Sequence, residues 1–311
     1  MKEETVDILL ATCNGFSFIA SQLDSILFQT HKQIHLIIRD DVSDDSTRKI
    51  LETYAQRFPD MITLIPADRR LGINGNFSCL MEHSTAPYIM FADQDDLWDH
   101  GKVSKTLEKM KELENCYSVD MPLLVHTDLK VVDRDLNDLS SSFWHYSGIT
   151  PLHSQTLNRL LMQNVVTGCA MMINRPLLQL AHPIPENAAM HDWWIALVAA
   201  AFGQIEALPL PTLLYRQHGK NTLGAQKFIS WNSFKRVCEK LRTPEDAKHA
   251  HAQELLSRYP HRLDTHQIAL LQAYKKLSSS SFFEKISLIF KYRFYKIGFL
   301  RNVVNLLLKR Q

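Results

Sequence analysis

Short apolar runs alternate with amphipathic helical patterns along the first hundred residues. Four runs are rich in β-branched or apolar residues and short enough for strands buried on both faces: Val6 to Ala11, Ile34 to Arg39, Met61 to Pro66 and Tyr88 to Ala92. Between them, the segments 16–28 and 44–58 place apolar residues three and four positions apart, which predicts helices. This alternation predicts an open, mostly parallel sheet, which is half of a nucleotide-binding architecture.

The alternation loosens after Asp96. The pattern predicts, in order, a charged helix at about 101–114, a strand Leu123 to Val132, a helix before Asn164, an apolar strand Val165 to Ile173 and a helix His191 to Phe202. From about residue 227 onward the patterns are helical only, with helix starts at Thr243-Pro244-Glu245 and at the capping-box sequence SFFE. We therefore place a boundary near residue 225, between an α/β domain and a helical extension.

Composition and charge exclude several classes of protein. Hydrophobic residues make up 45% of the 311 residues, which argues against a disordered or low-complexity chain. The formal net charge of +2 gives no global electrostatic case for nucleic acid. Five scattered cysteines without a CxxC pair favour a reducing, cytoplasmic compartment. Because the sequence has neither a signal peptide nor an apolar stretch of ~18 residues, we expect a soluble or peripheral protein.

Three carboxylates fall within four positions directly after the predicted strand that ends at Ala92. Asp93, Asp95 and Asp96 would repel one another unless a cation were bound. In open α/β sheets, ligands bind beyond the carboxyl ends of strands, which is where these acids lie. Carboxylates in such a place suit Mg²⁺ or Mn²⁺ together with a substrate diphosphate. The alternative is a solvated acidic turn.

A second acidic segment, RDDVSDDS, follows the second predicted strand. Ser43 or Asp44 is placed to cap the next helix, but capping does not require Asp40 and Asp41 as well. Those two carboxylates can accept hydrogen bonds from a base N–H and from ribose hydroxyls. After the first strand, the turn ATCNG contains small residues and a glycine, which lets a base approach the backbone.

Four motifs together resemble the donor half of family 2 glycosyltransferases, which have the GT-A fold. They are ATCNG, RDDVSDDS, LGINGNF and FADQDDLW, and the last is similar to that of bacterial rhamnosyltransferases of O-antigen and capsule synthesis. The resemblance covers roughly residues 5–220 and implies a nucleoside-diphosphate sugar donor with Mn²⁺ or Mg²⁺ as cofactor. Asp93 and Asp95 would form the DxD element, with Asp95 the direct metal ligand. The residues implied to bind the donor are Thr12, Asn14, Asp40, Asp41 and Asp93.

Two later segments complete the implied catalytic site. The helix that carries HDWW has Asp192 where the family keeps the base that takes the acceptor's hydroxyl proton, whereas a lone Asp there would otherwise be an N-cap or a salt-bridge partner. The segment LYRQHGKN resembles the one that closes the donor site. In it, His218 would be a third metal ligand, and Arg216 and Lys220 would hold the diphosphate.

Other candidates have an equally ordinary structural explanation. Gly168, in TGCAMM, would border the donor and acceptor sugars, although the same letters suit a core strand. Trp193 and Trp194 would form a platform for a sugar or be packed in the core. Asp128 is a weaker candidate of the same kind.

The segment from Phe282 to Gln311 repeats apolar residues at helical spacing among seven basic residues and one acid. A basic amphipathic helix of this kind suits the surface of an anionic membrane. The alternative is a helix packed on the catalytic domain with its cations in water.

The sequence therefore predicts a GT-A domain over residues 1–225, with a nucleotide-binding half (1–99) and an acceptor half (100–225), and a helical extension over 226–311. The predicted reaction is inverting transfer of a sugar, L-rhamnose from dTDP-rhamnose first, to a lipid-linked polysaccharide intermediate at the inner face of the cell membrane. A UDP-hexose or UDP-N-acetylhexosamine donor is the alternative. So is a catalytically silent nucleotide-sugar-binding subunit. A phosphoryl-transfer enzyme is disfavoured because no GxxxxGK[ST] loop is present.

Overall fold

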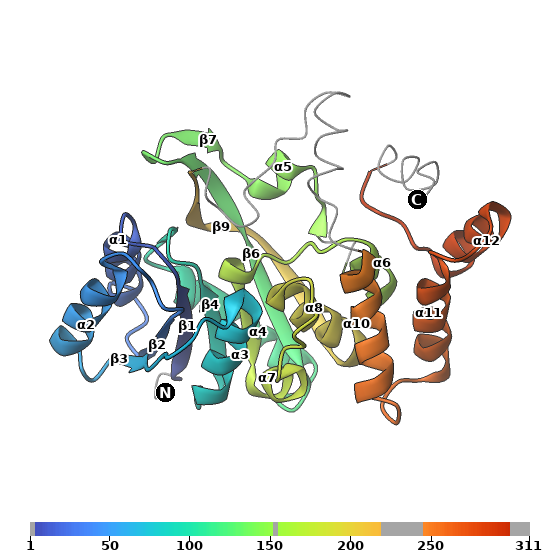
Figure 1. The fold of residues 1–311 in the computed structure, drawn as a ribbon, viewed down its shortest axis with the longest axis horizontal. Coiled ribbons are helices and arrows are strands. Elements are labelled where there is room, and N and C mark those ends of the chain that lie inside the picture. Colours follow the sequence, from blue (N-terminus) through green and yellow to red (C-terminus); the bar gives the residue numbers. More distant parts are fainter. Residues whose placement is uncertain (1–3, 152–154, 219–244, 299–311) are drawn as a thin grey trace.

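The computed structural model describes residues 4–151, 155–218 and 245–298, in which the strands form one sheet. The sheet order is β3-β2-β1-β4-β8-β6-β9-β5, with β7 paired to β6 (Figure 1). The strands are β1 (Val6–Thr12), β2 (Ile34–Asp40), β3 (Ile62–Ile65), β4 (Tyr88–Ala92), β5 (Leu97–Trp98), β6 (Leu123–Asp133), β7 (Asp138–Ser140), β8 (Met171–Asn174) and β9 (Gln204–Gln217).

Helices connect these strands and form the C-terminal part of the chain. They are α1 (Ile19–Leu27), α2 (Thr47–Arg57), α3 (Gly72–His83), α4 (Lys102–Cys116), α5 (Phe143–Ser147), α6 (Leu157–Met162), α7 (Arg175–Ala181), α8 (His191–Phe202), α10 (Glu245–Arg258), α11 (Thr265–Lys276) and α12 (Phe282–Tyr292). Within the described residues, no helix is both long enough and apolar enough to cross a bilayer.

The first four strands are parallel, as the sequence predicts. β1 lies between β2 and β4, and β3 pairs with the far side of β2. β8 then runs antiparallel to both β4 and β6, so the sheet becomes mixed after the nucleotide-binding half. The α/β fold class predicted from the sequence is confirmed.

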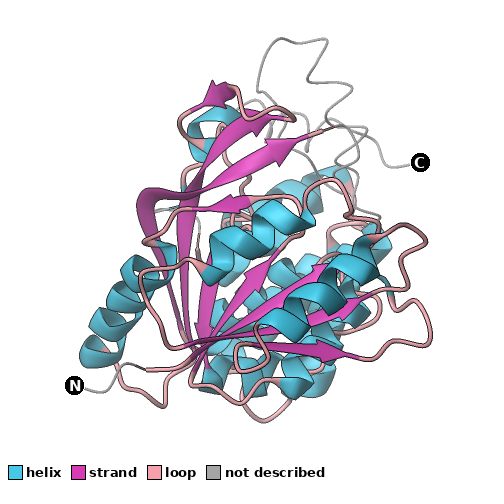
Figure 2. Cartoon of the chain, turned by 90° about the vertical axis from the view of Figure 1, so that its left-hand side faces the viewer, coloured by secondary structure: helices cyan, strands magenta, loops and turns pink. Residues whose placement is uncertain are grey.

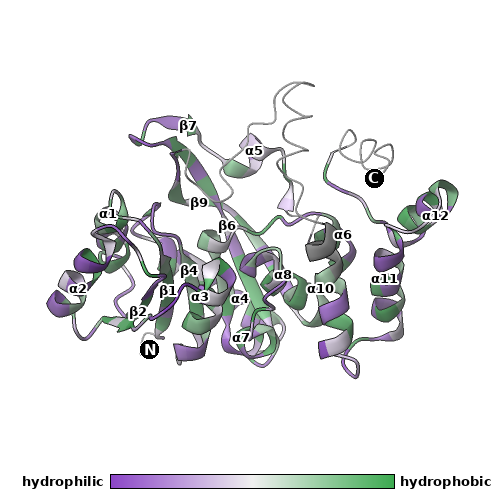
Figure 3. Cartoon of the chain, in the orientation of Figure 1, coloured by the Kyte–Doolittle hydropathy of each residue, from purple (hydrophilic) through white to green (hydrophobic). Residues whose placement is uncertain are grey.

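Both faces of the sheet are covered by helices (Figure 2). Side chains alternate between the faces along each strand, so Leu9 and Phe91 lie in one apolar cluster and Ile8 and Met90 in another. The first cluster is closed by α3, α7 and α8, and the second by α1, α2 and α4. Figure 3 shows the corresponding apolar residues concentrated in the strands at the centre of the molecule.

The helical extension shares its core with the α/β part of the chain. Leu255, Leu271, Tyr274 and Phe294 are buried in the same cluster as Trp194 of α8. Figure 1 shows α10, α11 and α12 at the end of the molecule opposite α1 and α2. The boundary near residue 225 stays a prediction, because it lies outside the described residues.

Two predicted elements differ from the structure. The strand expected over Val165–Ile173 is formed only as β8, because residues 168–170 make a single 3-10 turn. The helix expected from Phe282 to Gln311 ends at Tyr292, where Arg293 adopts a left-handed φ of 55° and Phe294 turns into the core. Thr243, Pro244 and the residues after 298 lie outside the described part of the chain.

Candidate active site

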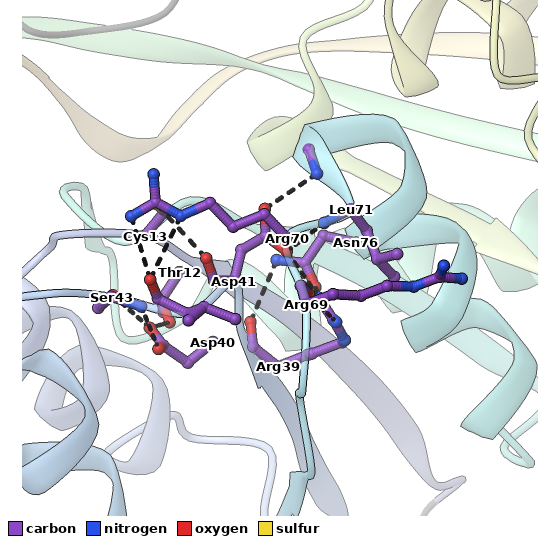
Figure 4. A network of polar contacts seen from close by, with 12 residues as sticks. Thr12, Cys13, Arg39, Asp40, Asp41, Ser43, Arg69, Arg70, Leu71 and Asn76 are labelled. Atoms are coloured by element: carbon purple, nitrogen blue, oxygen red, sulfur yellow. Dashed lines mark hydrogen bonds and ion pairs between the residues drawn. The ribbon is translucent and has the colours of Figure 1, made fainter.

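The predicted donor site lies where three neighbouring strands end. β1 pairs with β2 so that Thr12 is opposite Asp40, and it pairs with β4 so that Leu10 is opposite Ala92. The carboxyl ends of β2, β1 and β4 therefore meet at one edge of the sheet, and the loops that follow them carry the predicted motifs. Figure 4 shows the side chains gathered at the ends of β1 and β2.

Asp40 ties the ends of β1 and β2 together. One of its carboxylate oxygens accepts from the Thr12 hydroxyl at 2.7 Å and from the Ser43 hydroxyl at 2.6 Å, and the other accepts from the Ser43 N–H at 2.8 Å. Both residues predicted from the sequence, Thr12 and Asp40, are buried. Their polar atoms therefore bond to each other and to Ser43 within the protein.

Asp41 joins this edge to the start of α3. Its two oxygens accept from the backbone N–H groups of Leu71 at 2.7 Å and Gly72 at 2.9 Å, which are orphan donors at a helix N-terminus. Arg39 completes the cluster by donating to Asp41 at 2.8 Å and to the Asn76 side chain at 3.1 Å. The motifs RDDVSDDS and LGINGNF are thus in direct contact (Figure 4).

The turn after β1 is held by its neighbours on both sides. The side-chain oxygen of Asn14 accepts from Asp44 N–H at 2.9 Å, and the backbone N–H of Asn14 donates to the Ser43 hydroxyl at 2.8 Å. On the other side, the Gln94 side chain both accepts from Cys13 N–H at 2.8 Å and donates to the Cys13 carbonyl at 2.9 Å. A side chain at Gly15 would collide with Gln94, which explains the glycine at this position.

Val42 has a left-handed backbone, with φ of 57°. This conformation disfavours β-branched residues and suits glycine, so Val42 needs contacts that hold it in place. The Val42 carbonyl accepts from Arg70 at 3.1 Å, and Arg70 also forms a 3.7 Å ion pair with Asp44. These contacts hold the unusual turn in place.

Three acids lie together in the turn between β4 and β5. Burial, with Asp95 and Asp192 nearby, raises the pKa of Asp93 to about 7. Burial, again with Asp95 and Asp93, raises the pKa of Asp96 well above its usual range. One oxygen of Asp96 accepts from Arg216 N–H at 3.3 Å, while the other is buried without a hydrogen-bond partner in the described part of the chain.

β9 brings His218 and Arg216 to the same turn. β9 pairs antiparallel with β5, and His218 follows its last residue with its Nε2 2.6 Å from Asp95 Oδ2. Arg216 is buried, and its guanidinium donates to the backbone carbonyl of Asp95 at 2.9 Å and of Arg134 at 2.7 Å. Arg216 therefore holds the turn that carries Asp95. Lys220 lies outside the described residues.

Asp192 lies in the first turn of α8 with its carboxylate held on both oxygens. One oxygen accepts from the Gly168 N–H at 3.0 Å and the other from the Asn164 amide at 3.2 Å. Burial raises the pKa of Asp192 to about 6, although these hydrogen bonds act in the opposite direction. Gly168 has no room for a side chain, because a Cβ there would collide with His191.

The tryptophan pair lies in the core. Trp194 is fully buried and Trp193 nearly so, and their indole N–H groups donate to the carbonyls of Ala181 at 2.8 Å and Leu160 at 2.7 Å. A sugar platform needs an exposed ring, so the assignment of Trp193 and Trp194 to sugar binding is wrong. The carboxylate of Asp128 likewise bonds within the protein, since it accepts from the Ser142 hydroxyl at 2.5 Å and from Trp144 N–H at 3.1 Å.

Two residues at the site have no role in the sequence-based prediction. Gln94, the middle residue of the DxD element, connects the ends of β4 and β1. Asn164 contacts the carboxylate predicted to be the base. Gln94 was recognisable by its position between two acids, whereas Asn164 gives no local signal.

The residues present fit a divalent cation. Oxygen atoms of Asp93 and Asp96 and the sulfur of Cys169 all lie within 4.8 Å of one another, and Asp95 and His218 converge beside them. The buried oxygen of Asp96 that lacks a partner and the raised pKa of Asp93 are both signs of uncompensated negative charge. Carboxylates with one imidazole suit Mn²⁺ and, less well, Mg²⁺.

Comparison with known proteins agrees with this architecture. The dTDP-rhamnosyl transferase RfbG of Shigella flexneri is 30% identical over 230 residues, which are 70% of this chain and 74% of RfbG. The UDP-Glc:alpha-D-GlcNAc-diphosphoundecaprenol beta-1,3-glucosyltransferase WfaP of Escherichia coli is 32% identical over 35% of this chain and 42% of its own. The mannosyltransferase PcManGT of Pyrobaculum calidifontis, solved with GDP-Man and Mn²⁺, superposes with a TM-score of 0.54 at 15% identity, covering 100% of this chain and 89% of its own.

The family model described as Glycosyl transferase family 2 matches residues 7–179, which include β1 to β8 and all the motifs at the ends of β1, β2 and β4. The chain therefore belongs to glycosyl transferase family 2 and is a glycosyltransferase.

Proposed function

We propose that this glycosyltransferase inverts the anomeric centre of its donor sugar, with Asp192 as the base. The observation that carries this proposal is the convergence of three separate segments. The Asp95–His218 pair at 2.6 Å lies beside Asp93, and Asp192 is close enough to contribute to the raised pKa of Asp93. The arrangement supports a diphosphate held on one side of the reacting carbon and a carboxylate on the other.

In the proposed reaction, an acceptor hydroxyl attacks the anomeric carbon. The new bond joins the acceptor oxygen to that carbon, the bond to the diphosphate oxygen breaks, and the hydroxyl proton passes to Asp192. Hydrogen bonds from Gly168 and Asn164 fix the carboxylate, and a pKa of about 6 leaves it ionised yet basic near neutral pH. One displacement from the face opposite the leaving group gives inversion.

Asp95 and His218, with Asp93 close by, would hold the cation. When bound, it would neutralise the charge that develops on the departing diphosphate. Arg216 contributes by holding the carbonyl of Asp95, which fixes the direction of the turn. Direct contact of Arg216 and Lys220 with the diphosphate remains a prediction.

The donor we propose first is dTDP-L-rhamnose, and a UDP-hexose or UDP-N-acetylhexosamine is second. The FADQDDLW motif and the 30% identity to RfbG support rhamnose. The similarity to WfaP, whose name specifies UDP-Glc, keeps the second candidate open. Thymine and uracil differ by one methyl group, a contact of only ~1–3 kcal/mol, so the base alone does not separate these donors strongly.

A panel of nucleotide sugars tests the proposal. Hydrolysis or transfer is followed with Mn²⁺, with Mg²⁺ and with excess chelator, and the product anomer is read from NMR coupling constants. We expect dTDP-rhamnose to react fastest, only with a cation, and with inverted configuration. Retained configuration would refute the single displacement. Binding of donors without turnover of any would favour a silent nucleotide-sugar-binding subunit.

We also propose a lipid-linked glycan as acceptor and the surface of an anionic membrane as the place of reaction. The name of WfaP includes a diphosphoundecaprenol-linked acceptor, which supports this class. In the structure, α12 has one buried face, with Ile289, and one exposed face. Phe282, Phe290 and Phe283 lie within about 100° of one another around the helix and are 53%, 63% and 81% exposed.

This exposed aromatic face fits a lipid interface. Lys291 and Arg293 are exposed beside it, and interfacial helices combine aromatic residues with cations in this way. The expected stripe of apolar residues is divided, because Phe294 is buried in the core. The helix therefore packs on the protein with one face and leaves a different face for the membrane.

Liposome co-sedimentation tests the surface. We expect binding that rises with anionic lipid and falls with salt, because the attraction is screened within ~8 Å at physiological ionic strength. The double variant Phe283→Ser/Phe290→Ser should lose binding but keep donor hydrolysis, while Phe28→Ser, at an equally exposed phenylalanine in the nucleotide-binding half, should bind normally. Self-association that depends on Phe283 and Phe290, without liposome binding, would instead identify a contact between copies of the chain.

A further inference from the structure

One peptide unit just before α8 is held from two sides by side chains of distant helices. The carbonyl of Ala188 accepts from the Asn74 side chain of α3 at 2.7 Å. The N–H of the same peptide, on Ala189, donates to His251 Nε2 of α10 at 3.0 Å. This peptide lies three residues before Asp192, so both contacts act on the segment that leads into the proposed base.

The contact from α10 is buried and needs a neutral histidine. His251 is 1% exposed and packs edge-on against Trp193, with ring centroids 5.5 Å apart. Burial lowers the pKa of His251 to about 4, so at neutral pH the ring has an unprotonated nitrogen that accepts from Ala189. A residue of the helical extension thus bonds directly to the catalytic part of the chain.

The contact from α3 links the same peptide to the edge of the sheet where β1, β2 and β4 end. Asn74 lies in the first turn of α3, whose first N–H groups at Leu71 and Gly72 are held by Asp41. The side-chain oxygen of Asn74 is buried without a hydrogen-bond partner in the part of the chain that the structure describes. The bond to Ala188 is therefore the polar contact that orients this amide.

We propose that Asn74 and His251 are positioning residues that clamp the Ala188–Ala189 peptide and thereby fix where the Asp192 carboxylate lies. The proposal rests on the role of Asp192 as the base. Gly168 and Asn164 hold the carboxylate itself, whereas the clamp holds the backbone that carries it. If this is so, the helical extension contributes His251 to the positioning of the base. Helix α3 in turn connects Asp41, at the end of β2, to the segment that carries Asp192.

Conservative and disruptive variants separate positioning from general loss of structure. His251→Phe keeps the buried ring but removes the acceptor, and His251→Gln restores an acceptor at similar reach. Asn74→Ala removes the donor on the other side. Tyr259→Phe is the matched control, because Tyr259 directly follows α10 and the variant removes its 2.5 Å hydrogen bond to the Leu180 carbonyl, in a segment that does not lead directly to Asp192.

Hydrogen exchange of the full-length variants tests the clamp without any assumption about the reaction. We expect the Ala189 amide to exchange roughly tenfold faster in His251→Phe, the size of effect of one lost hydrogen bond. His251→Gln should restore protection, and Tyr259→Phe should leave this amide unchanged. Unchanged exchange at Ala189 in His251→Phe would overturn the clamp.

Kinetics with dTDP-rhamnose and Mn²⁺ test the link to the base. We expect kcat to fall about tenfold or more in His251→Phe and in Asn74→Ala, because misplacing a reacting group by ~1 Å can cost ~10²-fold. The KM for the donor should stay within about twofold, and His251→Gln should recover most of kcat. A rise in KM with unchanged kcat would refute the positioning role. If wild-type protein turns over no donor, the proposed function fails, and the exchange result alone decides the clamp.

Discussion

Two groups of acids, one at the end of β2 and one at the end of β4, have similar compositions and opposite environments. At the end of β2, Asp40 and Asp41 accept at least three hydrogen bonds each from neighbouring loops. At the end of β4, Asp93 and Asp96 crowd together, and burial raises the pKa of both. The first cluster is satisfied by the protein itself, whereas the second is left with an excess of negative charge.

This difference shows how the same residue type serves two purposes. Backbone N–H groups at a helix start favour a carboxylate, so Asp41 fixes the start of α3 against the end of β2. Buried carboxylates without such donors are costly unless a cation or a proton balances them. Such an imbalance favours the binding of a cation, because the cation supplies the positive charge that the surrounding protein does not.

The largest effect on turnover should come from Asp192, which lies near Asp93 at the end of β4. Asp192→Asn keeps the shape and the hydrogen bond to Gly168 but cannot take a proton. We expect kcat to fall ~10²–10⁴-fold, the usual contribution of a general base. Binding of dTDP in the presence of Mn²⁺, measured by calorimetry, should be unchanged. More than about a tenth of wild-type kcat in the variant would remove Asp192 from the mechanism.

Asp95→Ala should remove the proposed metal ligand among the acids at the end of β4. We expect the cation-dependent part of dTDP binding to be lost in calorimetry, a larger effect than the ~10–100-fold typical of residues that only support a ligand. Asp99→Ala is the control, because Asp99 is exposed, lies four residues away and pairs with Lys105 instead. Equal cation dependence in the two variants would contradict the assignment.

The sequence predicts the parallel strands well and contacts between distant segments poorly. β4 begins and ends at the predicted residues, because a buried strand between turns has an unambiguous pattern. The pair of hydrogen bonds that Asp41 accepts from the N–H groups of Leu71 and Gly72 has no local signal in the sequence. It depends on two loops 30 residues apart meeting at the same edge of the sheet.

The errors have physical causes of the same kind. α8 is buried on almost every side, so its periodicity cannot distinguish an exposed tryptophan from a packed one, and Trp193 and Trp194 were assigned to the sugar site. The C-terminal pattern continues past Tyr292, but Phe294 finds a place in the core and the helix ends. Tertiary packing decides both cases.

Asp41→Asn should destabilise the first cluster. The amide keeps the size of the side chain, yet its NH₂ group faces an N–H of Leu71 or Gly72 and leaves it unsatisfied. We expect a loss of about 1–3 kcal/mol in the free energy of unfolding, measured by urea denaturation. Asp44→Asn, at an exposed position of the same loop, should change it by less than ~1 kcal/mol. Equal effects would show that Asp41 does not hold α3.

The smallest effect we expect is the response of the metal-free protein to pH, and its sign distinguishes the two clusters. Asp93 and Asp192 have folded-state pKa values of about 7 and about 6, and the pKa of Asp96 is also raised, whereas an unfolded Asp titrates near ~3.9. Between about pH 4 and 7 these three carboxyl groups therefore bind more protons in the folded protein than in the unfolded chain, so their contribution to stability falls as pH rises. The buried His126, His191 and His251 act in the opposite direction, because burial lowers their pKa to about 3, 3 and 4 and they take up protons only on unfolding.

Thermal unfolding in excess chelator should accordingly show that Asp96→Asn has a higher Tm than the wild-type protein, and that this difference is larger at pH 7 than at pH 5.5. The variant removes a charge that burial disfavours, its asparagine still accepts from Arg216 N–H, and the contribution of the histidines is the same in both proteins. Mn²⁺ should raise the Tm of the wild-type protein more at pH 7 than at pH 5.5, since the cation competes with protons for the same carboxylates. A difference in Tm between Asp96→Asn and wild type that does not grow from pH 5.5 to 7 without metal would mean that the acids at the end of β4 are balanced by the protein, as those at the end of β2 are.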